Sequence, residues 1–352
     1  MRKRLPALLL ALLLSLLAGC GAAPGGAGGP EGRVITDMAG RTVTVPEEIA
    51  SAFPTDPTAG IYLYTLVPDR LLGWNYTLND TEKSVILEEY HDLPNFGMGD
   101  AVNYEAVIAA NPSIAFTVAS IGQGAVDSAD KLSEHLGIPV VVVSSDLPDT
   151  PAVYRFMGEL FGVEERAEAL AAYAEETFAA VADIPEADRL TVYYGNKEDS
   201  LETAPAGSSS AQVLEMANAV NAAGPELGGE GRVRISLEQL LAWDPDVIVV
   251  NGEPKASLGG SQAARDILSN PDLASLKAVQ TGRVYGAPNA PFSWIDRPPG
   301  PNRIAGVRWL FARLYPDACQ YDVDEEIRTF FRLFYHMELS DDQLRMLYEG
   351  QH

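Results

Sequence analysis

The sequence predicts an α/β fold of two Rossmann-like lobes, each with a mostly parallel sheet, joined by one long rigid α-helix. Three observations support this expectation. Short β-rich runs alternate with helical patterns in both halves of the chain, which is typical of parallel sheets with crossover helices. An uninterrupted run rich in Ala and Glu separates these two regions. A similar helix–strand pattern occurs once in each region, and 352 residues are more than one core normally serves.

The N-terminus has the three parts of a bacterial lipoprotein signal. A basic start, "MRKRL", precedes an apolar run that is short for a membrane span, and the run ends in "LAGC" at Cys20. The pattern resembles lipoprotein signal peptides generally, so we expect residues 1–20 to be the signal and Cys20 to be the lipidated residue. Residues 21–32, rich in Gly, Pro and Ala, then form a flexible tether. The alternative is an ordinary signal peptide with an incidental cysteine.

The first lobe is expected over residues 33–149. It opens with "RVITDMAGRTVTV", two β-rich runs around a Gly-containing turn, which predicts a small hairpin. Four further strands are predicted from "IASAF", "LLGW", "SIAFTV" and "IPVVVVSS". Helices are predicted between them, including "TEKSVILEEY" and "VDSADKLSEHLG".

The helical segment that links the lobes is expected over residues 150–184, and the second lobe over residues 185–352. Thr150 is placed as an N-cap and Pro151 as the first helical residue. The breaker-free run "VEERAEALAAYAEETFAAVADI" follows, long enough for about 30 Å of helix. Strand and helix patterns then alternate again through "RLTVYYG", "AQVLEMANAV", "SLEQLLAW", "DVIVV" and "RVYGAP", and two amphipathic helices close the chain.

The internal repeat relates the two lobes. "NYEAVIAANPSIAFTV" from Asn103 aligns without gaps to "SLEQLLAWDPDVIVVN" from Ser236. In both, a polar cap is followed by a Glu, a pair of helical apolar residues, a turn with Pro, and a buried strand. Glu105 aligns with Glu238. The simplest cause is two similar α/β lobes.

Composition and motif content exclude several classes of function. The net charge of −24 argues against nucleic acid, which needs a basic surface. Two cysteines and four scattered histidines predict neither a disulfide framework nor a histidine-rich metal site. Phosphate-binding loops, nucleophile elbows and His-Glu-x-x-His motifs are absent. We therefore expect no catalytic residue, cofactor or metal site; the alternative, a secreted α/β hydrolase, would need a base that the sequence does not offer. Cys319 is expected to be an inert thiol.

Polar and aromatic residues gather where the predicted strands end, which favours a binding protein. In parallel sheets ligands bind beyond the carboxyl ends of the strands, and two lobes can face each other across a cleft. These ends are rich in hydroxyls, amides and aromatics, which suits a small polar or anionic ligand. The candidate ligand-binding residues are Trp74, Asn75, Tyr194, Asn196, Asn251, Trp294 and Arg297.

Some of these candidates have a structural alternative. Trp74 ends an apolar strand and fits the core as well as the cleft. In "FSWIDRPPGPNR", the alternative is that Trp294 packs and that Arg297 makes a bracing salt bridge. If this stretch is fully extended, Trp294 and Asp296 share one face and Arg297 lies on the other.

Several motifs together resemble the substrate-binding lipoproteins of ABC importers for iron siderophores, haem and cobalamin, whose two lobes are joined by a single helix. "ITDMAGRTVTVP" is similar to the family's opening hairpin, and "LASLKAVQTGRVYGAP" to its late strand. "NYEAVIAANPS" and "SLEQLLAWDPDVIVV" are similar to its two helix–strand units, although "PSIAF" departs from the usual "PDLI". "SWIDRPPGPNRIAGVRWLFARLYPD" resembles a subgroup that includes molybdate and tungstate receptors.

The resemblance implies a lipid-anchored, extracytoplasmic receptor that is monomeric and performs no chemistry. It implies that Glu105 and Glu238 pair with arginines of the permease when the closed receptor docks. The structural alternative is that each carboxylate only favours the macrodipole of its helix, by about 0.3–1 kcal/mol. Its partners would be the permease with its ATPase, the membrane through the anchor, and a small metal-containing ligand. An iron complex is the first expectation and a molybdate or tungstate oxyanion the second, while the sequence does not choose among ferric chelate, haem, corrinoid and oxyanion.

Overall fold

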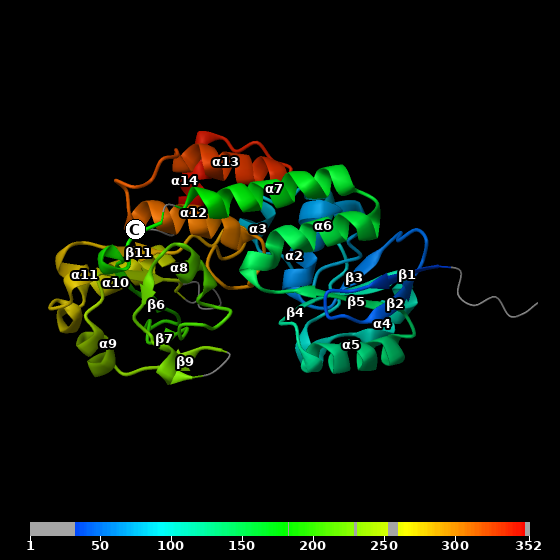
Figure 1. Ribbon diagram of the computed structural model, residues 1–352, viewed down its shortest axis with the longest axis horizontal. Coiled ribbons are helices and arrows are strands. Elements are labelled where there is room, and N and C mark those ends of the chain that lie inside the picture. The colour runs from blue at the N-terminus through cyan, green and yellow to red at the C-terminus, as the bar shows by residue number, and fades with distance from the viewer. Residues whose placement is uncertain (1–31, 182, 229–230, 253–259, 349–352) are drawn as a thin grey trace, which may run out of the picture.

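The computed structural model describes residues 32–348 apart from 182, 229–230 and 253–259. Two α/β lobes lie side by side, and the long helix α7 (Glu164–Ala180) runs along the upper side of both (Figure 1). The expected two-lobed α/β fold with mostly parallel sheets is therefore confirmed. The expected signal peptide, tether and Cys20 lie outside the described residues.

The N-terminal lobe is built on a three-stranded parallel sheet. Its strand order is β3 (Ala52–Pro54), β4 (Ile114–Ala119) and β5 (Val140–Ser144). The central strand β4 pairs with both neighbours, and all five residues of β5 are buried. The predicted hairpin is present as β1 (Arg33–Thr36) and β2 (Thr42–Val45), which lie at the end of this lobe that is remote from the C-terminal lobe (Figure 1).

Two predictions in this lobe are wrong in extent. "LLGW" is no strand but two isolated bridges, at Leu71 and Trp74. The helix expected at 81–90 is reduced to α3 (Asp80–Lys83) and a 3-10 turn (Glu88–Tyr90). A capping box at Asn79 starts α3, and Val85 and Ile86, which follow the end of this short helix, are buried in the core.

Helix α2 (Pro57–Leu66) was not predicted from the sequence. Its residues from Thr58 onward are all buried, so it has no amphipathic period that a sequence pattern could show. Asp56 caps its N-terminus by accepting a 3.0 Å hydrogen bond from Ala59 N–H. The start of α2 therefore lies at the carboxyl end of β3, at the edge of the sheet where the ligand site is expected.

Helix α6 (Thr150–Phe161) packs antiparallel against α7. Asp149 occupies the N-cap position, whereas Thr150 was expected there; the Thr150 hydroxyl instead donates to Leu147 O at 2.7 Å. Gly162, with φ +70°, ends α6 and allows the reversal into α7. Helix α7 itself is 17 residues long, slightly shorter than expected.

The C-terminal lobe contains a parallel sheet in the order β11–β10–β6–β8. The strands are β11 (Val284–Gly286), β10 (Val247–Val250), β6 (Thr191–Gly195) and β8 (Val220–Asn221). A two-stranded antiparallel ribbon, β7 (Glu202–Thr203) with β9 (Val233–Arg234), lies below β6 at the lower edge of this lobe in Figure 1. The helices of this lobe are α8 (Gln212–Met216), α9 (Leu237–Trp243), α10 (Gly260–Ser269) and α11 (Lys277–Gln280).

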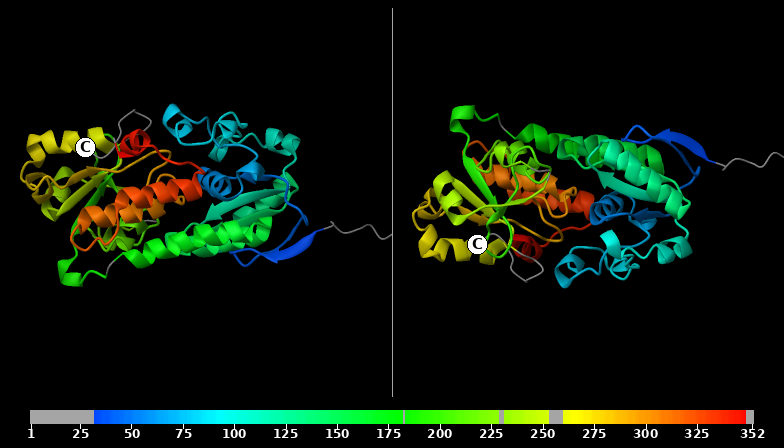
Figure 2. Two further views of the ribbon diagram at one scale, coloured as in Figure 1. Left: turned by 90° about the horizontal axis from the view of Figure 1, so that it is seen from above. Right: turned by 90° about the horizontal axis from the view of Figure 1, so that it is seen from below.

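Three C-terminal helices complete the fold, and their apolar faces join the two lobes. These are α12 (Asn302–Leu314), α13 (Val323–Phe334) and α14 (Asp341–Tyr348). The rings of Phe330 and Phe334 stack with centroids 4.6 Å apart, and Tyr154 of α6 meets Phe334 edge to face. In Figure 2, α12 and α13, in orange, run alongside α7, in green, and α13 reaches the blue helix α2 of the N-terminal lobe. One continuous apolar core therefore runs through both lobes.

The sequence repeat is also a structural repeat. Helices α4 (Tyr104–Ala110) and α9 each have seven residues and are capped by a side chain, Asn103 or Ser236, that accepts from the third helical N–H. Both end at a left-handed residue, Asn111 or Asp244, and both continue into a buried parallel strand.

None of the helices in the described part of the chain is both long and apolar enough to span a membrane.

Candidate functional site

Three neighbouring strands of the C-terminal sheet lead into asparagines. Asn196 follows β6, Asn251 follows β10, and Asn289 comes shortly after β11. The backbone N–H of Asn251 donates to Gly195 O at 2.9 Å, and the Asn289 side chain donates to Asn251 O at 3.2 Å. Because parallel strands end at one edge of a sheet, the order of the strands places these three amides in one row.

The amides of this row are not fully satisfied by the protein. Asn196 and Asn251 are completely buried, yet the Nδ2 atoms of both have no hydrogen-bond partner among the described residues. The Oδ1 atom of Asn289 is also buried and accepts no hydrogen bond from a described residue. A buried polar atom without a partner is costly and calls for a water or a ligand. The row thus offers two donors and one acceptor to a bound molecule.

Arg297, a candidate ligand contact from the sequence, lies beside this row. Its Nη2 atom is 3.5 Å from Asn196 Oδ1 and 3.8 Å from Glu202 Oε1. The side chain is 28 % exposed, so the guanidinium is at the border between the protein and solvent. A guanidinium in this position can meet an anionic group that approaches from solvent.

Asp296, the neighbour of Arg297 in the chain, is a buried carboxylate that pairs with Arg232. Its Oδ1 atom accepts a 2.6 Å hydrogen bond from the Tyr194 hydroxyl, and Arg232 Nε donates to Oδ2 at 3.1 Å. Burial, followed by the charge of Asp296, raises the pKa of Tyr194 well above its ordinary value. Tyr194 therefore remains neutral and donates its hydroxyl hydrogen bond to Asp296. Its side chain is buried behind the row of asparagines.

The stretch that carries Trp294 and Arg297 is bent, and the extended conformation considered for it is wrong. Ser293 N–H donates to Arg297 O at 3.2 Å, and the Ser293 hydroxyl accepts from Ile295 N–H at 3.2 Å, which closes the turn. Trp294 is fully buried against Phe331. Its Nε1 donates to Ala290 O at 3.1 Å. Its ring belongs to the core, so the expectation that it contacts a ligand is corrected.

Trp74 is also a core residue. It is 3 % exposed, its ring lies against Tyr64, and its Nε1 donates to Tyr90 O at 2.8 Å. An aromatic residue after an apolar run can point to either side of the chain, and here it points inward. Its neighbour Asn75 donates to Pro54 O at 2.9 Å, at the end of β3, while its Oδ1 has no partner among the described residues. Asn75 of the N-terminal lobe therefore resembles the three asparagines of the row, because it too has a buried amide atom without a partner among the described residues.

The remaining strand ends of the N-terminal lobe carry hydroxyls. Thr55 and Thr117 hydrogen-bond to each other at 2.9 Å, and Ser120 lies 3.4 Å from Ser145. Desolvation by burial raises the pKa of Asp56, the carboxylate at this edge that caps α2, although its hydrogen bonds oppose the shift. The carboxyl edge of the N-terminal sheet therefore carries mainly neutral hydroxyl groups.

A buried polar cluster connects the two lobes next to these strand ends. Arg303 of α12 donates to Ser145 O at 2.7 Å and to Gln212 Oε1 at 2.8 Å. The same Gln212 oxygen accepts from Leu147 N–H at 2.9 Å, and the Gln212 amide nitrogen donates to Asp146 at 3.0 Å. Arg303 is 0 % exposed and forms no ion pair with a carboxylate of the described residues. Its charge therefore adds a positive potential at the lobe boundary.

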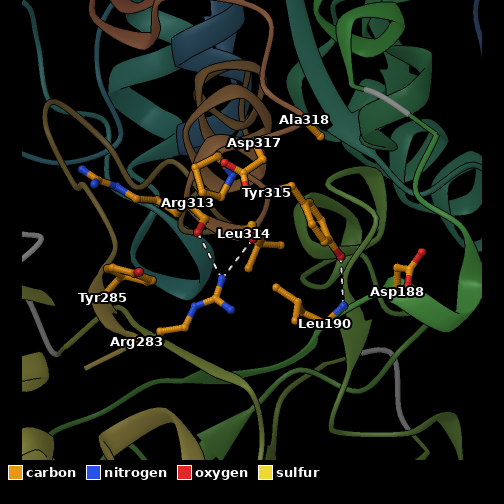
Figure 3. Close-up of a pocket in the computed structure, with 10 residues that line it drawn as sticks. Asp188, Leu190, Arg283, Tyr285, Arg313, Leu314, Tyr315, Asp317 and Ala318 are labelled. Atoms are coloured by element: carbon orange, nitrogen blue, oxygen red, sulfur yellow. Dashed lines mark hydrogen bonds between the residues drawn. The ribbon is translucent and has the colours of Figure 1, made fainter. Parts of the chain in front are cut away.

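A separate pocket lies on the C-terminal lobe at the opposite edge of its sheet, where β6 and β11 begin (Figure 3). In this pocket Arg283 donates to Leu314 O at 3.0 Å, and the Tyr315 hydroxyl accepts from Leu190 N–H at 3.0 Å. These bonds tie the end of α12 to the sheet, so we assign its polar groups a structural role.

The structure describes no constellation typical of catalysis or of a protein-held metal. Within the described ranges, no three His, Cys, Asp or Glu side chains form a group that could hold a metal ion. Cys319 is half-buried, with its Sγ 3.4 Å from Tyr321 O. What the strand ends can do is hold a molecule through amides, hydroxyls and a guanidinium.

Sequence reasoning found part of this arrangement. The structure brings Asn196, Asn251 and Arg297 together and places Tyr194 behind them, whereas it removes Trp74 and Trp294 to the core. It adds residues that the sequence analysis did not select: Asn289, Glu202, Arg232, Gln212 and Arg303. Asn289 directly follows the strand motif "VYGAP", so a local signal existed for it. The others come from distant segments and had none.

The comparisons with known proteins concern the family and the fold. The profile of a family described as "Periplasmic binding protein" matches residues 64–291. The fold is similar to an ABC transporter solute binding protein from Sulfurospirillum deleyianum, with 28 % identity, a TM-score of 0.80, and coverage of 90 % of this chain and 99 % of that one. No curated protein matches the chain.

Two further solved structures share the fold at lower identity. A periplasmic solute binding protein from Veillonella parvula has 23 % identity and a TM-score of 0.73, covering 90 % of this chain and 96 % of its own. The molybdate periplasmic binding protein MolA from Haemophilus influenzae, bound to molybdate, has 21 % identity and a TM-score of 0.66, covering 88 % and 99 %.

Proposed function

The chain belongs to the periplasmic binding protein family, as a solute-binding protein of ABC transporters, and we propose from this premise that its solute is an anionic, metal-containing ligand. Proteins of this family are extracytoplasmic, work with a permease and an ATPase, and are not enzymes. A hydrolase function is therefore set aside.

The observation that carries the proposal is the row of asparagines beside Arg297. Buried Nδ2 donors at Asn196 and Asn251, next to a partly exposed guanidinium, suit a ligand with anionic oxygens. The buried charge of Arg303 supports the same sign of ligand, since it has no ion pair within the described residues. Asn75 and the hydroxyls of the N-terminal lobe supply neutral contacts on the other side.

We propose an iron complex of the siderophore or chelate type as the first candidate ligand. This follows the family resemblance, and the hard oxygen donors that surround ferric iron in such chelates give the complex an anionic surface for Arg297 to meet.

A molybdate or tungstate oxyanion is the second candidate. Two observations favour it. The similar H. influenzae protein is described as bound to molybdate. In addition, Asn196 and Asn251 are 0 % exposed, and such an enclosed row fits a compact ligand better than a large one.

The remaining parts of the proposal concern delivery. Glu105 and Glu238 stand in equivalent first turns of α4 and α9, and both are exposed. We propose that they pair with permease arginines, one from each lobe. Cys20 would carry the lipid anchor and hold the receptor at the outer face of the cell membrane.

Isothermal titration calorimetry with molybdate, tungstate and ferric citrate tests the ligand, together with the metal content of protein purified from its own host. We expect one of the three probes to bind with a Kd in the micromolar range or below, which corresponds to about 8 kcal/mol. Binding of a cationic or neutral solute, with none of the three anions bound, would overturn the proposal.

A further inference from the structure

Glu202 is held opposite Asn196 by the backbone. The N–H of Asn196 donates to Glu202 O at 2.7 Å, and the N–H of Glu202 returns a 3.4 Å bond to Asn196 O. The Cα atoms of Asn196 and Glu202 are therefore held opposite each other. The side chains of both residues contact Arg297 Nη2.

The turn between them fixes this arrangement. Lys197 and Ser200 adopt positive φ angles of 72° and 55°, and the Tyr193 hydroxyl donates to Ser200 O at 2.7 Å. A Cβ on Gly195 would lie 2.7 Å from that same oxygen, so glycine is required there. The distance between Glu202 and Asn196 is thus a property of the folded loop.

The two carboxylates near Arg297 are bound very differently. Asp296 has a side-chain exposure of 0 % and is held by an ion pair with Arg232 and by the 2.6 Å bond from Tyr194. Glu202 is 25 % exposed and lies 3.8 Å from Arg297, with no shorter side-chain contact among the described residues. The negative charge of Asp296 is committed, whereas that of Glu202 can be displaced.

We propose that Glu202 is an internal counter-ion of Arg297 in the empty receptor and is displaced when an anionic ligand binds. This inference rests on the proposed function, because it requires a ligand with anionic oxygens at Arg297. Glu202 keeps the guanidinium beside Asn196 before binding, and its repulsion then lowers the affinity for every anion.

The proposal predicts that removing the charge of Glu202 improves binding. In Glu202→Gln, the affinity for an anionic probe should rise about three- to tenfold, since a like charge at this distance in a half-solvated site repels by that order. A purely structural role would give the opposite result, because damage to the loop lowers affinity.

Calorimetry with molybdate, tungstate and ferric citrate, at low and at high salt, tests the proposal on the parent protein and on Glu202→Gln. The matched control is Glu198→Gln, which removes one exposed carboxylate from the same loop with no contact to Arg297 among the described residues. Tighter binding by Glu202→Gln, diminished by salt, with the control within twofold of the parent, supports the proposal. If the parent binds a probe and Glu202→Gln binds it equally or more weakly, the inference fails alone. If the parent binds none of the probes, the proposed function fails and takes this inference with it.

Discussion

The guanidinium of Arg303 donates a 2.7 Å hydrogen bond to the main-chain oxygen of Ser145, 158 positions earlier in the chain and in the other lobe. Arg303 also binds Gln212, which in turn holds Leu147 and Asp146. The lobes are therefore joined by a buried polar cluster as well as by α7. Burial lowers the pKa of Arg303, but arginine remains charged in proteins, so the cluster holds a desolvated cation.

Replacing Arg303 should destabilise the whole protein. In Arg303→Met, Ser145 O and Gln212 Oε1 lose a donor, and we expect the free energy of unfolding to fall by about 1–3 kcal/mol. Urea unfolding followed by circular dichroism measures this change. Arg345→Met, at a guanidinium that is 71 % exposed, is the control and should change stability by less than about 1 kcal/mol. Equal stability of Arg303→Met and the parent would mean that desolvation of the cation cancels its bonds.

The part of the fold that local sequence signals specify was predicted in detail. The units α4–β4 and α9–β10 match the repeat in their caps and turns, because Asn103 and Ser236 act on backbone groups three residues away. Helix α2 was missed for the opposite reason. It is buried on all sides, so its sequence shows no polar face.

The candidate site divides in the same way. Asn196 and Asn251 could be selected because strand order alone brings the ends of parallel strands together. The direction of a side chain depends on packing, which is why Trp74 and Trp294 were assigned to the wrong side. Glu202 lies in β7 and Arg232 directly precedes β9, and their contacts with residues 296–297 depend on tertiary structure that no short motif encodes.

The paired glutamates should be needed for transport but not for binding. Hydrogen bonds from its own backbone N–H and from Ser236 lower the pKa of Glu238, so its charge is present at neutral pH. In the double variant Glu105→Ala with Glu238→Ala, we expect uptake in cells to be lost while the Kd of the purified receptor stays within a few fold. Glu134→Ala with Asp272→Ala, one exposed carboxylate in each lobe, is the matched control and should transport normally. A large loss of ligand affinity in the first pair would place these residues in the binding site.

Acid should destabilise the protein through His336. Burial first, and the charge of Arg166 second, lower the pKa of this imidazole from its ordinary 6.5. His336 Nε2 lies 3.3 Å from Tyr64 O, and Nδ1 lies 3.1 Å from Arg166 Nη2, an arrangement that suits the neutral ring. Since the unfolded chain takes up the proton first, stability is lost as the pH falls below 6.5 and until the folded-state pKa is passed.

Thermal and urea unfolding between pH 8 and pH 5 measure this effect. The variant His336→Asn keeps a residue that tolerates the positive φ of 57° but removes the titrating group. Its loss of stability over this range should be smaller than that of the parent by about 1 kcal/mol. Parallel pH profiles for the two proteins would show that His336 does not contribute.

The lipid anchor can be tested through Cys20, which lies outside the described residues. If Cys20 carries the proposed lipid anchor, Cys20→Ala should release the protein from the membrane fraction without unfolding it, because position 20 precedes the folded lobes in the sequence. Cell fractionation and the melting temperature of the released protein measure the two parts of this expectation. A variant that is still processed and still membrane-bound would point to a different mode of attachment.

The last prediction separates a ligand contact from a brace at Arg297. Its Nη2 atom is 3.5 Å from Asn196 Oδ1 and 3.8 Å from Glu202 Oε1, and its side chain is 28 % exposed, so a bound anion can reach the guanidinium beside the asparagine row. We expect Arg297→Ala to bind the active anionic probe about ten- to a hundredfold more weakly, with little change in melting temperature. Arg297→Lys should recover part of the affinity, because an ammonium restores the charge but not the planar fork. Calorimetry and thermal unfolding on the same samples decide the matter: unchanged affinity with a melting temperature lowered by several degrees would make Arg297 a brace for Glu202, and the anion would then have to be held by the asparagine row and Arg303.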